Sequence, residues 1–206
     1  MQRIISFDIG VKNLAVCLLE KPIESENPSI IYWDVIVLSE EKKPNLDSIA
    51  ESLFTKLDDL IEKYGLPDIV LIENQPALRN PTMKSVQICV YSYYMLAKHR
   101  NDTQKPEVMF ISATEKLKVV LPKKPTENGS TEVVAEAVKP KTKMSYAVRK
   151  KQSIQMALQL LETLGDVESL EKMKSHKKKD DMADSLLQAI AWIQKKKPKV
   201  HLKENK

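Results

Sequence analysis

Apolar positions near the start of the chain predict three β-strands. Residues 3–9 are apolar on both faces of an extended chain, and residues 13–20 and 30–38 have a similar pattern. A tight turn at Gly10–Asn13 joins the first two segments. Strands connected by so few residues pair in antiparallel fashion, so we expect a meander at the start of the chain.

Helical spacing and uninterrupted apolar runs follow along the rest of the chain. From Leu46 to Tyr64 apolar residues recur at helical intervals, and Gly65 and Pro67 supply the stop signals. The uninterrupted run 69–72 is typical of a central strand that is covered on both faces. The other expected elements are helices at about 80–99, 145–164 and 179–194, a short strand at 108–111, and a short helix at 115–121 that Pro122 ends.

Together these elements predict a mixed five-stranded α/β sheet, an antiparallel meander plus parallel strands, flanked by helices. We expect residues 1–206 to form a single domain, because a chain of this length suits one core. Residues 122–143 are rich in proline and lysine, and we expect them to be a mobile basic insertion. We expect the segment 172–179 to be a lysine-rich linker and the chain from 195 to be a frayed basic tail.

Composition argues against a membrane span and a disulfide framework. Hydrophobic residues make up 42% and charged residues 30% of the chain, as in globular proteins, and no apolar run reaches the roughly 18 residues of a span. Because the first predicted strand begins almost at once, we expect no signal or transit peptide. Cys17 and Cys89 lie within apolar patterns, as buried thiols do, so we expect an intracellular, reducing compartment and no membrane partner.

Charge is divided unevenly along the chain, whose net charge is +5. Residues 1–80 carry 8 Lys and Arg against 14 Asp and Glu, whereas residues 81–206 carry 25 against 14. The second part therefore has positive charge to place against a polyanion such as nucleic acid. A solvated lysine-rich surface explains the composition equally well, so charge alone does not decide between the two.

The most informative chemistry is a set of carboxylates in apolar surroundings. Asp8 lies inside the first predicted strand, Glu73 directly follows an apolar run, and Asp180, Asp181 and Asp184 open the last predicted helix. A carboxylate among apolar side chains is costly to desolvate unless a positive group meets it. Two Mg²⁺ ions about 4 Å apart can stabilise both the attacking and the leaving oxygen of a displacement at phosphorus. We therefore expect a metal-dependent enzyme that cuts phosphodiesters, with Asp8 bridging the metals.

The spacing of the last three acids leaves the choice of ligands open. Asp181 and Asp184 are three residues apart and Asp180 and Asp184 are four apart, so either pair shares a helix face. Each acid also has a simpler explanation. Asp8 could cap the turn that follows it, Glu73 could belong to a surface loop, and acids near a helix N-terminus are favoured by the helix dipole.

Basic residues flank these acids in the sequence. Residues 139–151 hold six basic residues and no acid, and Tyr146 among them could stack on a base or sugar. The segment 172–179 adds five lysines and His176, which we expect to be a surface residue and not a catalytic one. The expected DNA-binding residues are Lys139, Lys141, Lys143, Tyr146, Arg149, Lys177, Lys178 and Lys179.

Four motifs resemble one family of nucleases. Residues 6–15, Ser-Phe-Asp-Ile-Gly-Val-Lys-Asn-Leu-Ala, resemble the opening strand of the RuvC-like Holliday junction resolvases, which belong to the ribonuclease H-like superfamily. Residues 72–76 are similar to the second acidic motif of that family. Residues 145–151 and 178–189 are similar to the basic motif and the closing motif of its poxvirus and fungal mitochondrial branch. The start of the chain has no extension before the first motif, which resembles the viral members.

This resemblance implies a ribonuclease H-like fold and a homodimeric endonuclease that resolves four-way DNA junctions in recombination and repair. It implies dependence on Mg²⁺ or Mn²⁺, with two ions in each site, and cleavage that leaves a 5′-phosphate. The implied metal ligands are Asp8, Glu73, Asp181 and Asp184, with Asp180 as an alternate. The implied catalytic residues are the first four of these acids together with Lys150 and Lys151. One of the two lysines is implied to reach the scissile phosphate. For a viral protein, the implied location is a cytoplasmic viral replication site.

Other functions of the same fold stay open. One is a nuclease for RNA/DNA hybrids or other branched DNA, and another is a nucleic-acid-binding relative without catalysis, against which the intact acids argue. An ATPase of the actin or hexokinase type is disfavoured, because the chain has only four glycines for phosphate loops. The helix at 80–99 is apolar on more than one side, which fits either a dimer contact or burial within the monomer.

Overall fold

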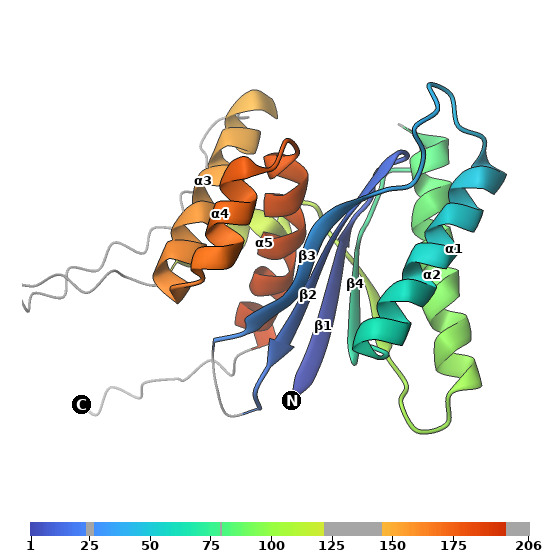
Figure 1. Cartoon of the computed structure of the whole chain (residues 1–206), viewed down its shortest axis with the longest axis horizontal. Coiled ribbons are helices and arrows are strands. Elements are labelled where there is room, and N and C mark those ends of the chain that lie inside the picture. The colour runs from blue at the N-terminus through green and yellow to red at the C-terminus, as the bar shows by residue number, and fades with distance from the viewer. Residues whose placement is uncertain (24–26, 79, 122–145, 197–206) are drawn as a thin grey trace, which may run out of the picture.

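A mixed sheet forms the centre of the protein in the computed structural model, which describes residues 1–23, 27–78, 80–121 and 146–196 (Figure 1). The strands are β1 (Gln2–Asp8), β2 (Asn13–Lys21), β3 (Ser29–Val37), β4 (Ile69–Glu73) and β5 (Glu107–Ile111). The helices are α1 (Leu46–Tyr64), α2 (Pro81–Arg100), the short 3-10 helix η1 (Glu115–Lys118), α3 (Tyr146–Leu164), α4 (Val167–Ser175) and α5 (Lys179–Lys196).

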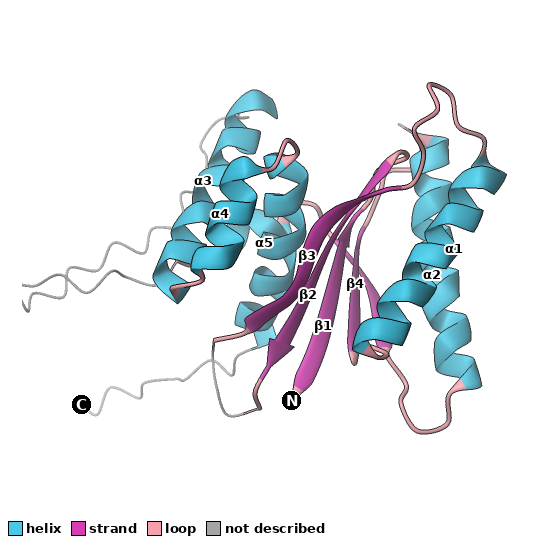
Figure 2. Cartoon of the chain, viewed as in Figure 1, coloured by secondary structure: helices cyan, strands magenta, loops and turns pink. Residues whose placement is uncertain are grey.

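The five strands lie in the order β3-β2-β1-β4-β5. β1 pairs with β2 and β2 with β3 in antiparallel fashion, whereas β1 pairs with β4 and β4 with β5 in parallel. The predicted meander and the predicted mixed five-stranded sheet are therefore both confirmed. Figure 2 shows helices on both sides of this sheet, with α1 and α2 on one side and α3, α4 and α5 on the other.

Alternate residues of the central strands face opposite helical layers. On β1, Ile4 packs into the cluster that includes α5, whereas Ile5 and Phe7 pack into the cluster that includes α1 and α2. Every residue of Ile69–Glu73 in β4 is buried. A strand that is covered on both faces needs apolar side chains at consecutive positions, which is why 69–72 reads as an uninterrupted apolar run.

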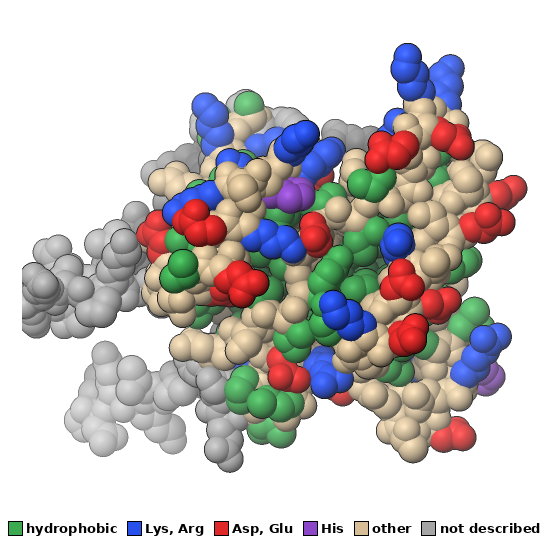
Figure 3. Space-filling model, viewed as in Figure 1, with side chains coloured by type: hydrophobic (Ala, Val, Ile, Leu, Met, Phe, Trp, Pro, Cys, Tyr) green, Lys and Arg blue, Asp and Glu red, His purple; other side chains and the backbone are tan. Residues whose placement is uncertain are grey.

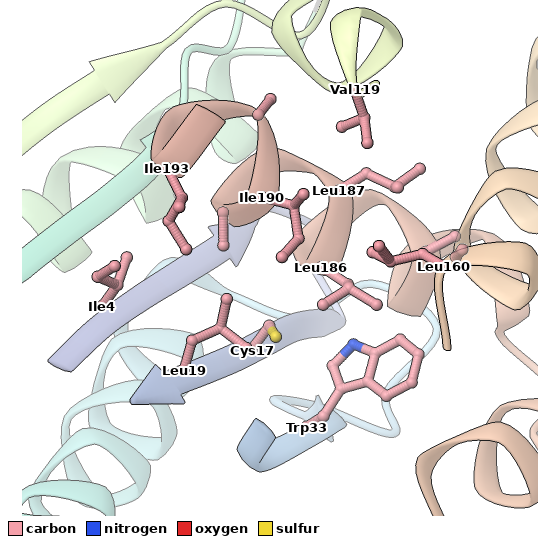
Figure 4. Packing of buried hydrophobic residues seen from close by; sticks show 14 of the residues in the cluster. Ile4, Cys17, Leu19, Trp33, Val119, Leu160, Leu186, Leu187, Ile190 and Ile193 are labelled. Carbon is pink, nitrogen blue, oxygen red and sulfur yellow. The ribbon is translucent and has the colours of Figure 1, made fainter. Parts of the chain in front are cut away.

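Helix α5 lies directly on the sheet. Figure 4 shows Leu186, Ile190 and Ile193 of α5 pointing toward the strands that carry Ile4 and Leu19. These side chains belong to one cluster and are each at most 4% exposed. Burial of this apolar surface holds α5 against β1, β2 and β3.

The ends of α1 lie where the sequence predicts them. Asn45 Oδ1 accepts a hydrogen bond of 2.8 Å from the Ser48 amide at the start of the helix. Gly65 ends the helix with a φ of 80° and donates its amide to Ile61 O at 2.8 Å. A positive φ is strained for residues with a Cβ, so glycine is the residue that stops this helix.

Three expectations need correction. The segment 172–179 is not a linker throughout, because α4 extends to Ser175 and Asp166 caps its start by accepting from the Ser169 amide at 3.0 Å. The short helix expected at 115–121 is limited to the single 3-10 turn of η1. Helix α5 runs on through Lys196, so the tail does not begin at 195. The expected insertion at 122–143 lies outside the described residues, and no helix within them is long and apolar enough to cross a bilayer.

Candidate active site

The ends of two parallel strands bring the first two acids together. Phe7 of β1 lies opposite Ile72 of β4, so the next residues, Asp8 and Glu73, end neighbouring strands at the same edge of the sheet. Glu73 is 8% exposed, which contradicts the simpler explanation of a surface loop. Parallel strands gather functional groups at their carboxyl ends, and here that edge holds two carboxylates.

Helix α5 brings the remaining acids to the same edge. It begins at Lys179, with Asp180 and Asp181 in its first turn and Asp184 one turn later. Figure 1 shows the start of α5 near the end of the sheet at which β1 and β4 finish. All five predicted acids line a single cleft of about 630 Å³, so the structure brings together acids that lie far apart in the sequence.

A lysine that the sequence did not single out joins the acids. Lys116 Nζ lies 3.1 Å from Glu73 Oε2 and 2.5 Å from Asp184 Oδ2. Lys116 belongs to η1, which follows β5, and β5 runs parallel to β4. The available signal was this topology, since a segment that follows a parallel strand reaches the same edge of the sheet as Glu73.

Burial and neighbouring charges shift the pKa values of the acids in the cleft. Burial, followed by the negative charge of Glu73, raises the pKa of Asp8 well above its usual range, although Lys116 partly opposes this. Burial also raises the pKa of Asp184 and of Asp181, and the Asp180 carboxylate raises that of Asp181 further. Burial alone would lower the pKa of Lys116, but the surrounding carboxylates outweigh it and raise that pKa. For Asp8 and Asp184, burial and the negative charge of Glu73 therefore outweigh the attraction of Lys116.

The donors fit a hard dication in type but not in their present spacing. Carboxylate oxygens are the ligands that Mg²⁺ prefers, and Asp184 Oδ1 is buried without a hydrogen-bond partner in the described part of the protein. Among the described residues, however, no three His, Cys, Asp or Glu side chains are close enough to hold an ion. The Lys116 ammonium lies between Glu73 and Asp184, so a metal there would require these side chains to move.

The turn after β1 requires a glycine at position 10, and this requirement is separate from the alternative in which Asp8 caps the turn. A Cβ on Gly10 would lie 2.4 Å from Asn13 O, so the close approach of the backbone requires glycine there. Asp8 instead lines the cleft with the other acids.

The predicted basic residues divide into three groups. Arg149, Lys150 and Lys178 line the cleft beside the acids. Lys150 pairs with Asp180. Burial would raise the pKa of Asp180, but the contact with Lys150 outweighs burial and lowers that pKa. Lys178 Nζ lies 3.8 Å from Asp181 Oδ2.

The other basic residues lie away from the cleft or outside the described residues. Lys151 and Lys177 are exposed, and Lys179 is half-buried at the start of α5. Lys139, Lys141 and Lys143 lie outside the described residues; Tyr146 is the first residue of α3, but its side chain falls outside the description. His176 is 25% exposed, lies 3.8 Å from Asp34 Oδ1 and does not line the cleft. In the view of Figure 3, Lys and Arg side chains gather at the end of the α3–α4–α5 layer where α5 begins.

The sheet order and the placement of the helices are those of the RuvC-like resolvase fold, which the four motifs together predicted. Solved structures share this fold. The fowlpox virus resolvase, crystallised with Holliday junction DNA, has a TM-score of 0.61 at 19% identity, covering 94% of this chain and 98% of that one. The yeast mitochondrial Holliday junction resolvase Ydc2 has a TM-score of 0.61 at 22% identity, covering 94% and 79%. Thermus thermophilus RuvC with its junction substrate has a TM-score of 0.56 at 12% identity, covering 93% and 92%.

Sequence comparisons match this chain to viral proteins. The family described as Poxvirus A22 protein matches residues 126–196, which include α3, α4 and α5. Uncharacterized protein L451 of Acanthamoeba polyphaga mimivirus is 30% identical over an alignment of 179 residues, and the match covers 80% of this chain and 40% of that protein. Uncharacterized protein 170L of Invertebrate iridescent virus 6 is 46% identical over 54 residues, 25% of this chain and 22% of that one. The chain thus spans less than half the length of these viral relatives.

Proposed function

We propose that this protein is a metal-dependent endonuclease that resolves four-way DNA junctions. The observation that carries the proposal is the convergence of Asp8, Glu73 and Asp184, from two strands and a helix, in one cleft beside Arg149 and Lys150. Carboxylates that hold a dication next to basic groups that hold phosphate are what phosphodiester hydrolysis requires. The fold shared with junction resolvases supports the choice of substrate.

The roles of the acids follow from their neighbours. Asp8, Glu73 and Asp184 would hold the metal, and Asp181 is favoured over Asp180 as the next ligand because Asp180 is engaged by Lys150. When bound, Mg²⁺ or Mn²⁺ supplies positive charge at the phosphate and makes water a stronger nucleophile at neutral pH. No serine or cysteine nucleophile is needed in this scheme, and the cut strand keeps a 5′-phosphate.

The basic residues hold the DNA backbone. Lys150 lines the cleft and Lys151 does not, so Lys150 is favoured for contact with the scissile phosphate. Arg149 and Lys178 flank it and can bind neighbouring phosphates. Such contacts read the shape of a junction and not its sequence, so binding should weaken steeply as salt concentration rises.

The test is cleavage of a synthetic four-way junction, with each strand labelled in turn, in Mg²⁺, in Mn²⁺ and in EDTA. We expect paired cuts at symmetric positions that ligase can seal, and no cuts in EDTA or with the Asp8→Asn variant. A linear duplex and an RNA/DNA hybrid are the competing substrates. Cleavage that is equal with the Asp8→Asn variant, or preferential for the hybrid, would sink the proposal.

A second function, a non-catalytic binder of nucleic acid, is favoured by one observation. Lys116 already neutralises Glu73 and Asp184, as a permanent substitute for a metal would. The two functions differ in their response to Mn²⁺ in the absence of DNA. A nuclease should show a higher melting temperature in Mn²⁺ than in EDTA, because bound metal stabilises the native state, whereas the binder should not.

A homodimer is part of the same proposal. On α2, Ile88 and Leu96 are 43% and 52% exposed, and on β5 Phe110 is 41% exposed and stacks on Tyr91. A four-way junction offers two equivalent strands, so a second copy of this chain related by twofold symmetry fits this surface. We expect light scattering to give twice the chain mass of 23.5 kDa, and Ile88→Glu to shift it toward one chain. A wild-type monomer would refute this part.

A further inference from the structure

One glutamine lies where the sheet and α5 meet and takes no part in the proposed chemistry. Gln188 is 1% exposed in the middle of α5, between the buried residues Leu187 and Ala189. A buried amide is costly unless its groups are hydrogen-bonded, so its presence among apolar neighbours needs an explanation.

The contacts of Gln188 give that explanation. Its Nε2 lies 3.1 Å from Ser6 Oγ, 3.3 Å from Phe7 O and 3.5 Å from Leu71 O. Phe7 directly precedes Asp8 on β1, and Leu71 lies two residues before Glu73 on β4. A single side chain therefore contacts both acid-bearing strands just before their acids.

The third acid-bearing element is the helix of Gln188 itself. Asp184 is four residues earlier on α5, so the two side chains lie one turn apart on the same face. The hydrogen bonds of Gln188 to β1 and β4 therefore fix the position and rotation of α5 on these two strands. The relative positions of Asp8, Glu73 and Asp184 depend on that placement.

We propose that Gln188 is a positioning residue that sets the spacing of the three acid-bearing elements for binding a divalent cation. The inference rests on the metal site of the proposed function and deepens it. Within the described residues, the hydrogen bonds of Gln188 Nε2 go to the two strands that carry Asp8 and Glu73. Residues that orient metal ligands in this way usually change metal affinity about 10- to 100-fold when they are lost.

Replacement by methionine separates this role from a purely structural one. Gln188→Met keeps the length and nearly the volume of the side chain but removes its N–H donors. An apolar side chain suits the apolar surroundings, so the melting temperature should stay within a few degrees of wild type. Metal affinity should fall nonetheless, because the strands lose the bonds that hold them in register with α5.

The measurement is Mn²⁺ titration by electron paramagnetic resonance without DNA, followed by single-turnover cleavage. We expect Gln188→Met to bind Mn²⁺ about 10- to 100-fold more weakly and to cut more slowly at a fixed Mn²⁺ concentration, with recovery at high Mn²⁺. The matched control is Tyr94→Phe, which also removes a buried polar group, but in the opposite layer where the hydroxyl has no hydrogen-bond partner in the described part of the chain. Tyr94→Phe should bind Mn²⁺ as wild type does.

Each outcome decides the matter. A folded Gln188→Met protein with wild-type Mn²⁺ affinity would overturn the inference. If Gln188→Met does not fold, Gln188→Asn keeps the amide but shortens its reach, and weakened Mn²⁺ binding is again expected; failure of both to fold would make Gln188 a structural residue and overturn the inference. A wild-type protein that neither binds Mn²⁺ nor cuts junctions would overturn the nuclease proposal as well, which distinguishes the two failures.

Discussion

The two helical layers hold the same sheet by different means. Helix α1 buries only apolar side chains, and its contact residues are Ile49, Leu53, Leu57 and Leu60. Helix α5 buries leucines and isoleucines too, but it also buries Ser185 and Gln188. Apolar contact is not directional, whereas hydrogen bonds fix position as well as distance.

Polar anchors on the α5 side cluster around its first turns. The Trp33 indole N–H of β3 donates to Met182 O at 3.0 Å and to Ser185 Oγ at 3.2 Å. Met182 and Ser185 lie on either side of Asp184 in the sequence. The layer that carries acids is thus tied to the sheet by directional bonds.

The opposite layer has one comparable feature, and it too lies near an acid. Gln87 of α2 is fully buried, and its Oε1 accepts from the Gln75 amide at 2.7 Å, two residues beyond Glu73. Buried polar groups therefore gather at the acidic edge of the sheet. The comparison suggests that directional bonds are retained where carboxylates must be placed, and that apolar packing suffices elsewhere.

The largest effect is expected from Asp8→Asn on the acid-bearing edge. Cleavage should fall by about three powers of ten or more, because the several kcal/mol of charge stabilisation from the metal is lost. The free energy of unfolding should not fall, since the raised pKa of Asp8 marks a carboxylate whose charge is unfavourable in the metal-free protein. Single-turnover cleavage and fluorescence anisotropy test this; loss of junction binding in a folded variant would contradict it.

Leu53→Ala on α1 is expected to lower stability without changing metal affinity. Leu53 is fully buried, so its truncation should lower the free energy of unfolding by about 2–5 kcal/mol. The Mn²⁺ affinity of the folded fraction should be unchanged, because Leu53 packs in the apolar cluster of this layer and does not line the cleft that holds the acids. Urea denaturation and Mn²⁺ titration measure the two effects, and a large loss of metal affinity would erase the distinction between the layers.

A smaller effect is expected from pH in the absence of metal. The pKa values of Asp8, Asp181 and Asp184 are raised in the folded protein, so the folded state holds more protons than the unfolded state between the ordinary and the raised values. Stability should therefore fall as pH rises through this range, the reverse of the usual carboxylate behaviour. Asp180, whose pKa is lowered, contributes in the opposite direction.

Urea denaturation from about pH 4 to about pH 8, in EDTA and in Mn²⁺, tests this dependence. We expect a decline in EDTA that Mn²⁺ reduces, because the metal takes over the charge of the carboxylates. Asp184→Asn is the control and should show a shallower decline. An equally steep decline in Asp184→Asn would mean that the acids are not crowded together.

Much of this arrangement could be predicted because each acid interrupts an apolar pattern. Asp8 and Glu73 stand out at the ends of apolar runs, and their proximity follows once those strands pair in parallel. Lys116 carries no such signal, and Gln188 interrupts the apolar run of α5 without a charge that would mark it as functional. A lysine in a polar turn and a glutamine in a helix are ordinary residues, and only the tertiary fold gives them partners.

Helix α4 escaped prediction for a different reason. Of its residues only Met173 is buried, so its apolar stripe is short, and its lysines are typical of a linker. The signal that was present is Asp166, which caps the helix from just before its first residue. A helix that is capped but buries little apolar surface is therefore difficult to predict from composition and apolar spacing.

The smallest effect is expected at the outer edge of the sheet, from Asp34→Asn on β3. Asp34 Oδ2 lies 2.9 Å from Lys172 Nζ of α4, but the two side chains are 37% and 41% exposed. Exposed pairs are screened by water and salt, so stability should fall by less than about 1 kcal/mol, and the difference should vanish at high salt. Mn²⁺ affinity should be unchanged, because neither Asp34 nor Lys172 lines the cleft that holds the acids. A charge pair on the surface and an amide in the core would then have opposite signatures: Asp34→Asn would alter stability slightly and metal binding not at all, whereas Gln188→Met would alter metal binding with little change in stability. If Asp34→Asn weakened Mn²⁺ binding as strongly as Gln188→Met, the position of α5 would depend on its whole surroundings, and the role assigned to the buried polar anchors would be wrong.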